Sequence, residues 1–94
     1  MNTSAKGARA ERRERRILEA KGYAVVRAGG SLGVFNLVAI RRDGLRLVQV
    51  KCNRRPGQAE RERLGAFNNL PPNTLRELWL FRNRQRNPQI EVLR

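Results

Sequence analysis

The 94-residue sequence predicts an α/β fold, a central mixed β-sheet flanked by helices, with the element order α-β-β-β-α-β-β. Three observations predict it. Two stretches are rich in helix-forming residues, several short runs are rich in β-branched, leucine or aromatic residues, and Gly or Pro marks most of the boundaries. A chain of this length is at the small end of domain sizes, so we expect one domain over residues 1–94.

The first predicted helix runs from Ala8 to Ala20, after a small, polar start to the chain. No Gly or Pro interrupts it, and Ala10, Ile17 and Leu18 share one helical stripe, with Glu14 between them. A glycine two residues after Ala20 ends the helix, as glycine commonly does.

Three strands are predicted next, at Tyr23–Arg27, Val34–Ile40 and Leu45–Lys51. A glycine-rich connection follows the first strand. The Asp43-Gly44 pair between the other two is a strong hairpin signal, so these strands should be antiparallel neighbours.

The second half of the chain predicts one helix and two strands. Pro56 suits the first turn of a helix that runs to about Leu70, because proline is favoured at the first helical position. Two prolines then end the helix. The strands are predicted at Leu75–Phe81 and Gln89–Leu93.

If Asp43-Gly44 forms a two-residue turn, Asn36 faces Lys51 and Val38 faces Gln49 across the hairpin. Side chains alternate between the two sides of a strand. One predicted face carries Asn36, Val38, Ile40, Leu47, Gln49 and Lys51, and the other carries Phe35, Leu37, Ala39, Val48 and Val50.

The charge balance indicates a polyanion partner. The chain has 21 Lys+Arg against 8 Asp+Glu, a formal charge of +13, and only three of the basic residues are lysine. Arginine forms bidentate contacts with phosphate, so nucleic acid is favoured over an anionic membrane. With no His and one Cys, the composition excludes disulfide frameworks, His-dependent triads and zinc sites built from several such side chains, and it fits a reducing, cytoplasmic setting. No apolar run is long enough to cross a bilayer.

The polar end of the predicted hairpin is a candidate site. Asn36, Gln49 and Lys51 gather there, although a buried strand has no packing reason to place them together. They could be a hydrogen-bonded polar cap, or a site where the lysine meets an anion or a water beside two amides.

Four segments of the first half carry a resemblance. The segments K-G-A-R-A-E (6–11), G-Y-A-V-V-R-A-G-G-S (22–31), N-L-V-A (36–39) and V-Q-V-K (48–51) occur in the order and spacing of a known family. The chain resembles the archaeal-type Holliday junction resolvases, a branch of the PD-(D/E)xK nuclease superfamily. The resemblance implies a restriction-endonuclease-like fold and a homodimeric, structure-selective endonuclease. Such an enzyme would cut four-way DNA junctions by Mg²⁺-dependent hydrolysis.

The resemblance also implies roles for individual residues. Glu11, Asn36 and Gln49 fall on the family's metal-binding positions, and Lys51 falls on its catalytic lysine. Ser31 falls on a loop serine that would support the scissile phosphate. The implied cofactor is Mg²⁺, a hard cation that prefers carboxylate oxygens.

Two of these positions depart from the family. Asn36 stands where the family has Asp, and Gln49 stands where it has the acid of an E-x-K motif. Losing two charges should weaken Mg²⁺ binding, so we expect this chain to bind DNA better than it cuts it. The sequence leaves open whether Asn36 is natural or an introduced isosteric change, and whether Glu11 or Glu14 is the helix acid.

Basic residues around the first helix and the predicted site are expected to contact DNA. They are Arg9, Arg12, Arg13, Arg27, Arg54 and Arg55. Two other functions stay open: a DNA- or RNA-binding module that retains the nuclease fold without catalysis, and a basic RNA- or ribosome-associated protein.

The apolar content of the second half exceeds what a thin domain easily buries. Ala66, Phe67 and Leu70 with Leu78–Phe81 are either ordinary core or part of a homodimer interface.

Overall fold

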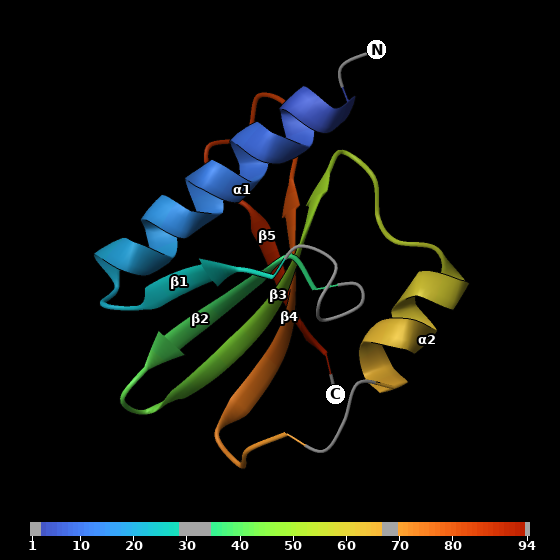
Figure 1. Ribbon diagram of the computed structural model, residues 1–94. Helices are drawn as coiled ribbons and strands as arrows, with labels where there is room; N and C mark the ends of the chain where they lie inside the picture. Colours follow the sequence, from blue (N-terminus) through green and yellow to red (C-terminus); the bar gives the residue numbers. More distant parts are fainter. Residues whose placement is uncertain (1–2, 29–34, 67–69, 94) are drawn as a thin grey trace.

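A computed structural model of the chain describes residues 3–28, 35–66 and 70–93. The α/β fold and its element order are as predicted, with one five-stranded sheet and two helices (Figure 1). The elements are α1 (Thr3–Ala20), β1 (Ala24–Arg27), β2 (Leu37–Arg41), β3 (Gly44–Cys52), α2 (Gln58–Ala66), β4 (Thr74–Phe81) and β5 (Gln89–Leu93).

The strands lie in sequence order, β1-β2-β3-β4-β5, and the sheet is mixed. Every neighbouring pair is antiparallel except β3 and β4, which are parallel. A parallel pair needs a long crossover connection, and α2 lies in that crossover. Helix α1 packs against β1, β2 and β3 (Figure 1). No helix in the described part of the chain is long and apolar enough to cross a membrane.

Both helices differ in length from the prediction. Helix α1 begins at Thr3 rather than Ala8. The only breaker in the added turn is Gly7, and an internal glycine costs a helix only about 1 kcal/mol. Helix α2 is shorter than predicted, from Gln58 to Ala66. Residues 67–69 lie outside the described part of the chain.

The hairpin turn is one position earlier than predicted. Arg41 pairs with Gly44, so Arg42 and Asp43 form the two-residue turn. The Arg41 guanidinium donates two hydrogen bonds to the Asp43 carboxylate, at 2.7 and 2.8 Å. Gly44 is needed for a different reason, because a side chain there would clash with the carbonyl oxygen of Asn73.

This turn shifts the register by two residues, so the predicted pairing of Val38 with Gln49 is wrong and Val38 pairs with Leu47. The predicted pairing of Asn36 with Lys51 is also wrong, since the backbone N–H of Asn36 donates to the backbone carbonyl of Val48 at 2.8 Å. A shift of two preserves which side chains share a face.

Phe35 does not follow the predicted alternation. Strand β2 begins only at Leu37, so the chain before it is free to turn. Phe35 is fully buried and packs with Leu47 and Leu64, in the cluster next to α2 rather than with the Leu37 face.

Two apolar clusters lie against the sheet. The larger one lies beneath α1 and includes Leu18, Val48, Trp79 and Phe81, with Cys52 packed at its edge. All four residues of Leu78–Phe81 are buried within one chain, so the ordinary-core reading holds for β4. Phe67 lies outside the described residues.

Candidate functional site

Gln49 and Lys51 meet a carboxylate from α2. Glu60 Oε2 accepts a hydrogen bond from Gln49 Nε2 at 2.7 Å and pairs with Lys51 Nζ at 2.9 Å. The hydrogen bond from Lys51, and then the one from Gln49, lower the pKa of Glu60 below its usual value. Glu60 is therefore ionised at neutral pH and neutralises Lys51.

The local structure explains this contact. Gln49 and Lys51 are two residues apart on β3, so their side chains leave the same face of the sheet. Glu60 lies in the first turn of α2, where the helix dipole favours a negative charge. Gln49 is 4 % exposed, and its Oε1 has no hydrogen-bond partner among the described residues. In this trio of Gln49, Lys51 and Glu60, Gln49 therefore keeps a buried acceptor without a partner among the described residues.

Asn36 joins the same end of β3 through the backbone. Its Oδ1 accepts a hydrogen bond from the amide of Val50 at 2.7 Å. The pairing of β2 with β3 begins at Leu37, so this side-chain oxygen accepts a backbone hydrogen bond just beyond the paired residues. The structure therefore brings Asn36, Gln49 and Lys51 together, as the sequence predicts, although with a different register.

Helix α1 carries three acids, and the two candidates for the helix acid, Glu11 and Glu14, have different surroundings. Glu11 lies 3.3 Å from the guanidinium of Arg27, and its side chain is 23 % exposed. Glu14 is fully buried. Its pKa rises to about 9, chiefly because burial penalises the charged form, with smaller contributions from Glu77 and Glu11. Of these two, only Glu11 is accessible to a ligand, so Glu14 is a poor candidate for the helix acid.

The other predicted site residues have mixed surroundings. Ser31 lies outside the described residues. Arg27 and Arg54 are exposed, and Arg55 pairs with Glu91 at 3.5 Å. The arginines predicted on α1 line a groove on the other side of the sheet from the Glu60 trio. They are Arg9, Arg12 and Arg13.

Comparison with known proteins decides the family. A model of the archaeal Holliday junction resolvase (Hjc) family matches residues 2–63, more than half of the chain. The chain belongs to the archaeal Holliday junction resolvase family. Among solved structures, it is similar to Hjc of Archaeoglobus fulgidus, a Holliday junction resolvase from an archaeal hyperthermophile, with 22 % identity and a TM-score of 0.75. That match covers 94 % of this chain and 73 % of the other, and it supports the fold. No curated protein matches the chain.

Sequence reasoning missed Glu60, which contacts Gln49 and Lys51 on β3. The available signal was its place near the start of a helix that follows Lys51 closely. The contact depends on how residues 53–57 orient α2 against β3, and sequence periodicity alone does not give that orientation.

Proposed function

We propose that this member of the resolvase family binds four-way DNA junctions, and that its own metal-dependent cleavage is strongly weakened by Asn36 and Gln49. One observation carries the proposal: both amides are used inside the protein. Asn36 accepts from the Val50 amide and Gln49 donates to Glu60, at 2.7 Å each. Together the two positions offer one unpartnered oxygen, Gln49 Oε1.

These residues do not fit Mg²⁺ well. The described part of the chain contains no group of three or more His, Cys, Asp or Glu side chains that could hold a metal ion. Glu60, which contacts Gln49, is paired with Lys51, and Glu11 on α1 is paired with Arg27. Mg²⁺ sheds its water reluctantly and favours anionic oxygens, so two amides are poor replacements for two acids. The residues at this site therefore do not support metal-dependent hydrolysis as they stand.

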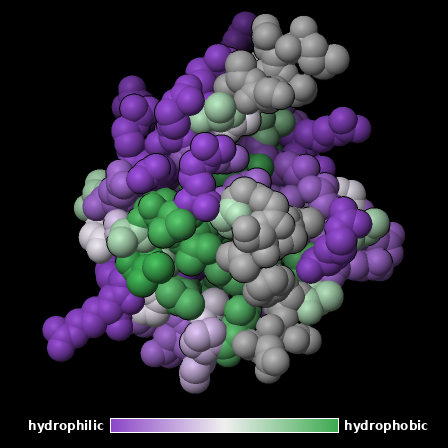
Figure 2. All heavy atoms as spheres, in the orientation of Figure 1, coloured by the Kyte–Doolittle hydropathy of each residue, from purple (hydrophilic) through white to green (hydrophobic). Residues whose placement is uncertain are grey.

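We also propose that the chain acts as a homodimer, because a four-way junction is two-fold symmetric and paired nicks need two sites. Figure 2 shows apolar side chains gathered on one face, over β1 and β2, beside hydrophilic ones. Val26 and Ile40 belong to these strands and are 52 % and 44 % exposed. Light scattering of the wild type and of Val26→Lys tests this interface, and an unchanged molar mass in the variant would place the interface elsewhere.

Junction binding is tested by measuring the affinity of the chain for a labelled four-way junction and for linear duplex of the same arm sequence. We expect tighter binding to the junction, with affinity that falls steeply with salt because phosphate contacts release counterions. Equal affinity for both DNAs would contradict junction recognition.

The weakened-cleavage part is tested by restoring acids. The Asn36→Asp/Gln49→Glu variant should bind Mn²⁺ or Mg²⁺ about 10² to 10⁴ times more tightly than the wild type, if each charge-assisted contact contributes about 1.5 to 3 kcal/mol. Calorimetry measures that affinity, and a supercoiled or junction substrate measures nicking. Asn36→Asp alone is the matched intermediate. Efficient cleavage by the unaltered chain would contradict the proposal.

A non-catalytic DNA- or RNA-binding module is the second candidate. It is favoured by the same hydrogen bonds, since an amide that serves the sheet ladder, as Asn36 does, has a structural reason to be present. If the restored variant binds no metal and the chain prefers RNA to the junction, this second function is supported.

A further inference from the structure

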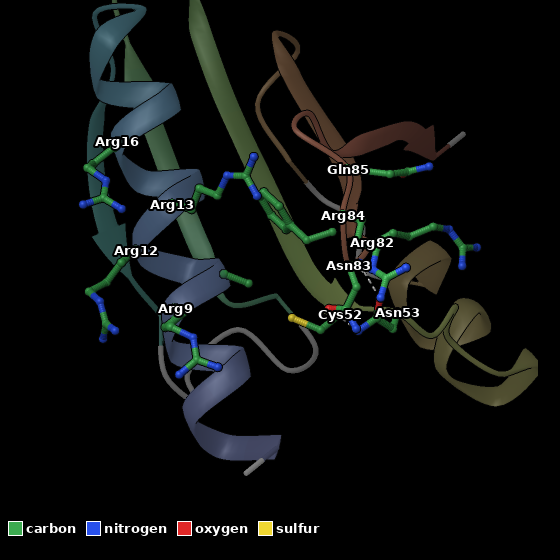
Figure 3. A pocket seen from close by; sticks show the side chains of 12 residues that line it. Arg9, Arg12, Arg13, Arg16, Cys52, Asn53, Arg82, Asn83, Arg84 and Gln85 are labelled. Carbon is green, nitrogen blue, oxygen red and sulfur yellow. Dashed lines mark hydrogen bonds between the residues drawn. The ribbon is translucent and has the colours of Figure 1, made fainter.

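An arginine-lined groove lies between α1 and the turn that joins β4 to β5. Its volume is about 630 Å³. Helix α1 forms one side and residues 82–85 form the other, with Cys52 and Asn53 between them (Figure 3). Among the described residues, six arginines and no acidic residue line it. They are Arg9, Arg12, Arg13, Arg16, Arg82 and Arg84.

These six arginines differ from the arginines of the chain that form ion pairs. Six arginines elsewhere in the described residues pair with carboxylates, as Arg41 does with Asp43 and Arg61 with Glu91. Within the described ranges, none of the six groove arginines forms an ion pair. Arg13 points from α1 into the space between the two sides, and its guanidinium lies 5.3 Å from the centre of the Phe81 ring. The groove thus gathers positive charge that the protein leaves uncompensated, and an anion would offset the repulsion.

The turn that carries Arg82 and Arg84 is held in place. Asn53 Oδ1 accepts from the Asn83 amide at 2.8 Å, and Asn53 Nδ2 donates to Asn83 Oδ1 at 3.2 Å. Both Asn53 and Arg84 have left-handed backbone conformations, with φ of 60° and 66°. Such a conformation is uncommon for arginine. The asparagine pair therefore fixes the second side of the groove next to α1.

The spacing of the cations fits an extended polyanion. Arg9, Arg13 and Arg16 follow one side of α1, and a helix rises 1.5 Å per residue, so they span about 10 Å. A DNA strand carries a phosphate about every 3.4 Å along the duplex axis, so this span matches about three phosphates. A single small anion would leave most of these cations unpaired.

We propose that this groove binds the phosphate backbone of one duplex arm, an inference that rests on the proposed junction binding. Arg82 and Arg84 lie beyond the residues 2–63 that the family model matches, so family membership does not assign them a role. The groove begins at Cys52, directly after Lys51, and lies on the α1 side of the sheet. An arm that leaves the end of β3 on this side would meet both walls of the groove.

The first test removes two groove charges. Arg82→Gln/Arg84→Asn is the groove variant, since asparagine tolerates the left-handed backbone at position 84. Arg42→Gln/Arg86→Gln is the control, which removes the same charge from exposed residues that do not line the groove. We expect the groove variant to bind the junction about tenfold more weakly and to lower the slope of log K against log salt by about 1.8, and the control to change little.

Equal affinity and slope in the two variants would overturn the groove while leaving junction binding intact. If the wild type does not prefer the junction to duplex, the proposed function fails, and a groove-specific loss of duplex binding would still support the groove. Unfolding temperatures of both variants identify any loss caused by misfolding. In that case Arg9→Gln/Arg16→Gln, which removes charge from α1 instead, gives the deciding comparison.

The second test uses Cys52, the only cysteine of the chain, as a probe inside the groove. Its rate of reaction with a maleimide is measured alone, with junction DNA, with inorganic phosphate and with phosphatidylserine vesicles. We expect strong slowing by the junction and little by phosphate or vesicles. Slowing by phosphate alone would indicate a small-anion site, slowing by vesicles alone a lipid site, and no slowing with bound junction a different DNA face. Each of these three results would overturn the proposal.

Discussion

Two glutamates on opposite sides of the sheet have opposite environments. Glu60, on the α2 side, contacts Gln49 and Lys51, and these partners lower its pKa. Glu14, on the α1 side, is fully buried, neither of its oxygens has a hydrogen-bond partner among the described residues, and its pKa rises to about 9. A carboxylate with partners stays charged and can interact with ligands, whereas one without partners becomes a neutral part of the core. This difference gives opposite responses to pH and to substitution.

The largest effect is expected at Glu14. Holding a carboxyl with a folded pKa of about 9 against an ordinary value of 4.5 destabilises the fold at pH 7 by about 3 kcal/mol. Glu14→Leu should remove this penalty and complete the apolar stripe with Leu18. We expect the unfolding temperature at pH 7 to rise by more than about 10 °C, measured by circular dichroism.

The pH dependence gives the control for that prediction. Because the folded pKa of Glu14 is raised, its stabilising protonated form is fully present below about pH 4.5 and is lost as the pH rises toward 9. The stability of the wild type should therefore fall over this range relative to Glu14→Gln, which cannot ionise. Parallel stability curves for the two proteins would show that Glu14 is already charged in the fold.

A smaller effect is expected when a second acid is introduced next to Glu60. Gln49→Glu would place a second carboxylate at the 2.7 Å contact with Glu60, so the pair must share a proton or bind a cation. We expect a loss of about 2 kcal/mol in urea unfolding at pH 8, partly recovered in millimolar Mg²⁺ because a ligand of the native state stabilises it.

The exchange variant Gln49→Glu/Glu60→Gln is the matched control for this pair. It keeps one carboxylate and one amide at the same contact, so its stability should return to near the wild-type value without metal. If Gln49→Glu is as stable as the exchange variant and does not respond to Mg²⁺, the two side chains separate in solution.

The sequence predicted these sites unequally, for physical reasons. Local periodicity placed Gln49 and Lys51 on one face correctly, because alternation on a strand depends only on neighbouring residues. It also placed Glu14 on the apolar stripe of α1, although it did not decide between Glu14 and Glu11. The hairpin register was wrong because Gly44 is required by Asn73, a contact from far along the chain. The position of Glu60 likewise depends on a loop conformation that local patterns do not contain.

The smallest effect concerns the loss of folding stability at acidic pH. Because the folded pKa of Glu60 is lowered, its pairing stabilises the chain above its ordinary value of 4.5 and is lost as the pH falls through the folded pKa. The pair is partly exposed, so the contribution is no more than about 1 kcal/mol. Glu60→Gln should lower stability at pH 7 and converge with the wild type in acid, while Glu62→Gln, an exposed acid on the same helix, should change stability in neither condition. Convergence of the two curves at high pH instead of low pH would mean that Glu60 is destabilising in the folded state, as Glu14 is.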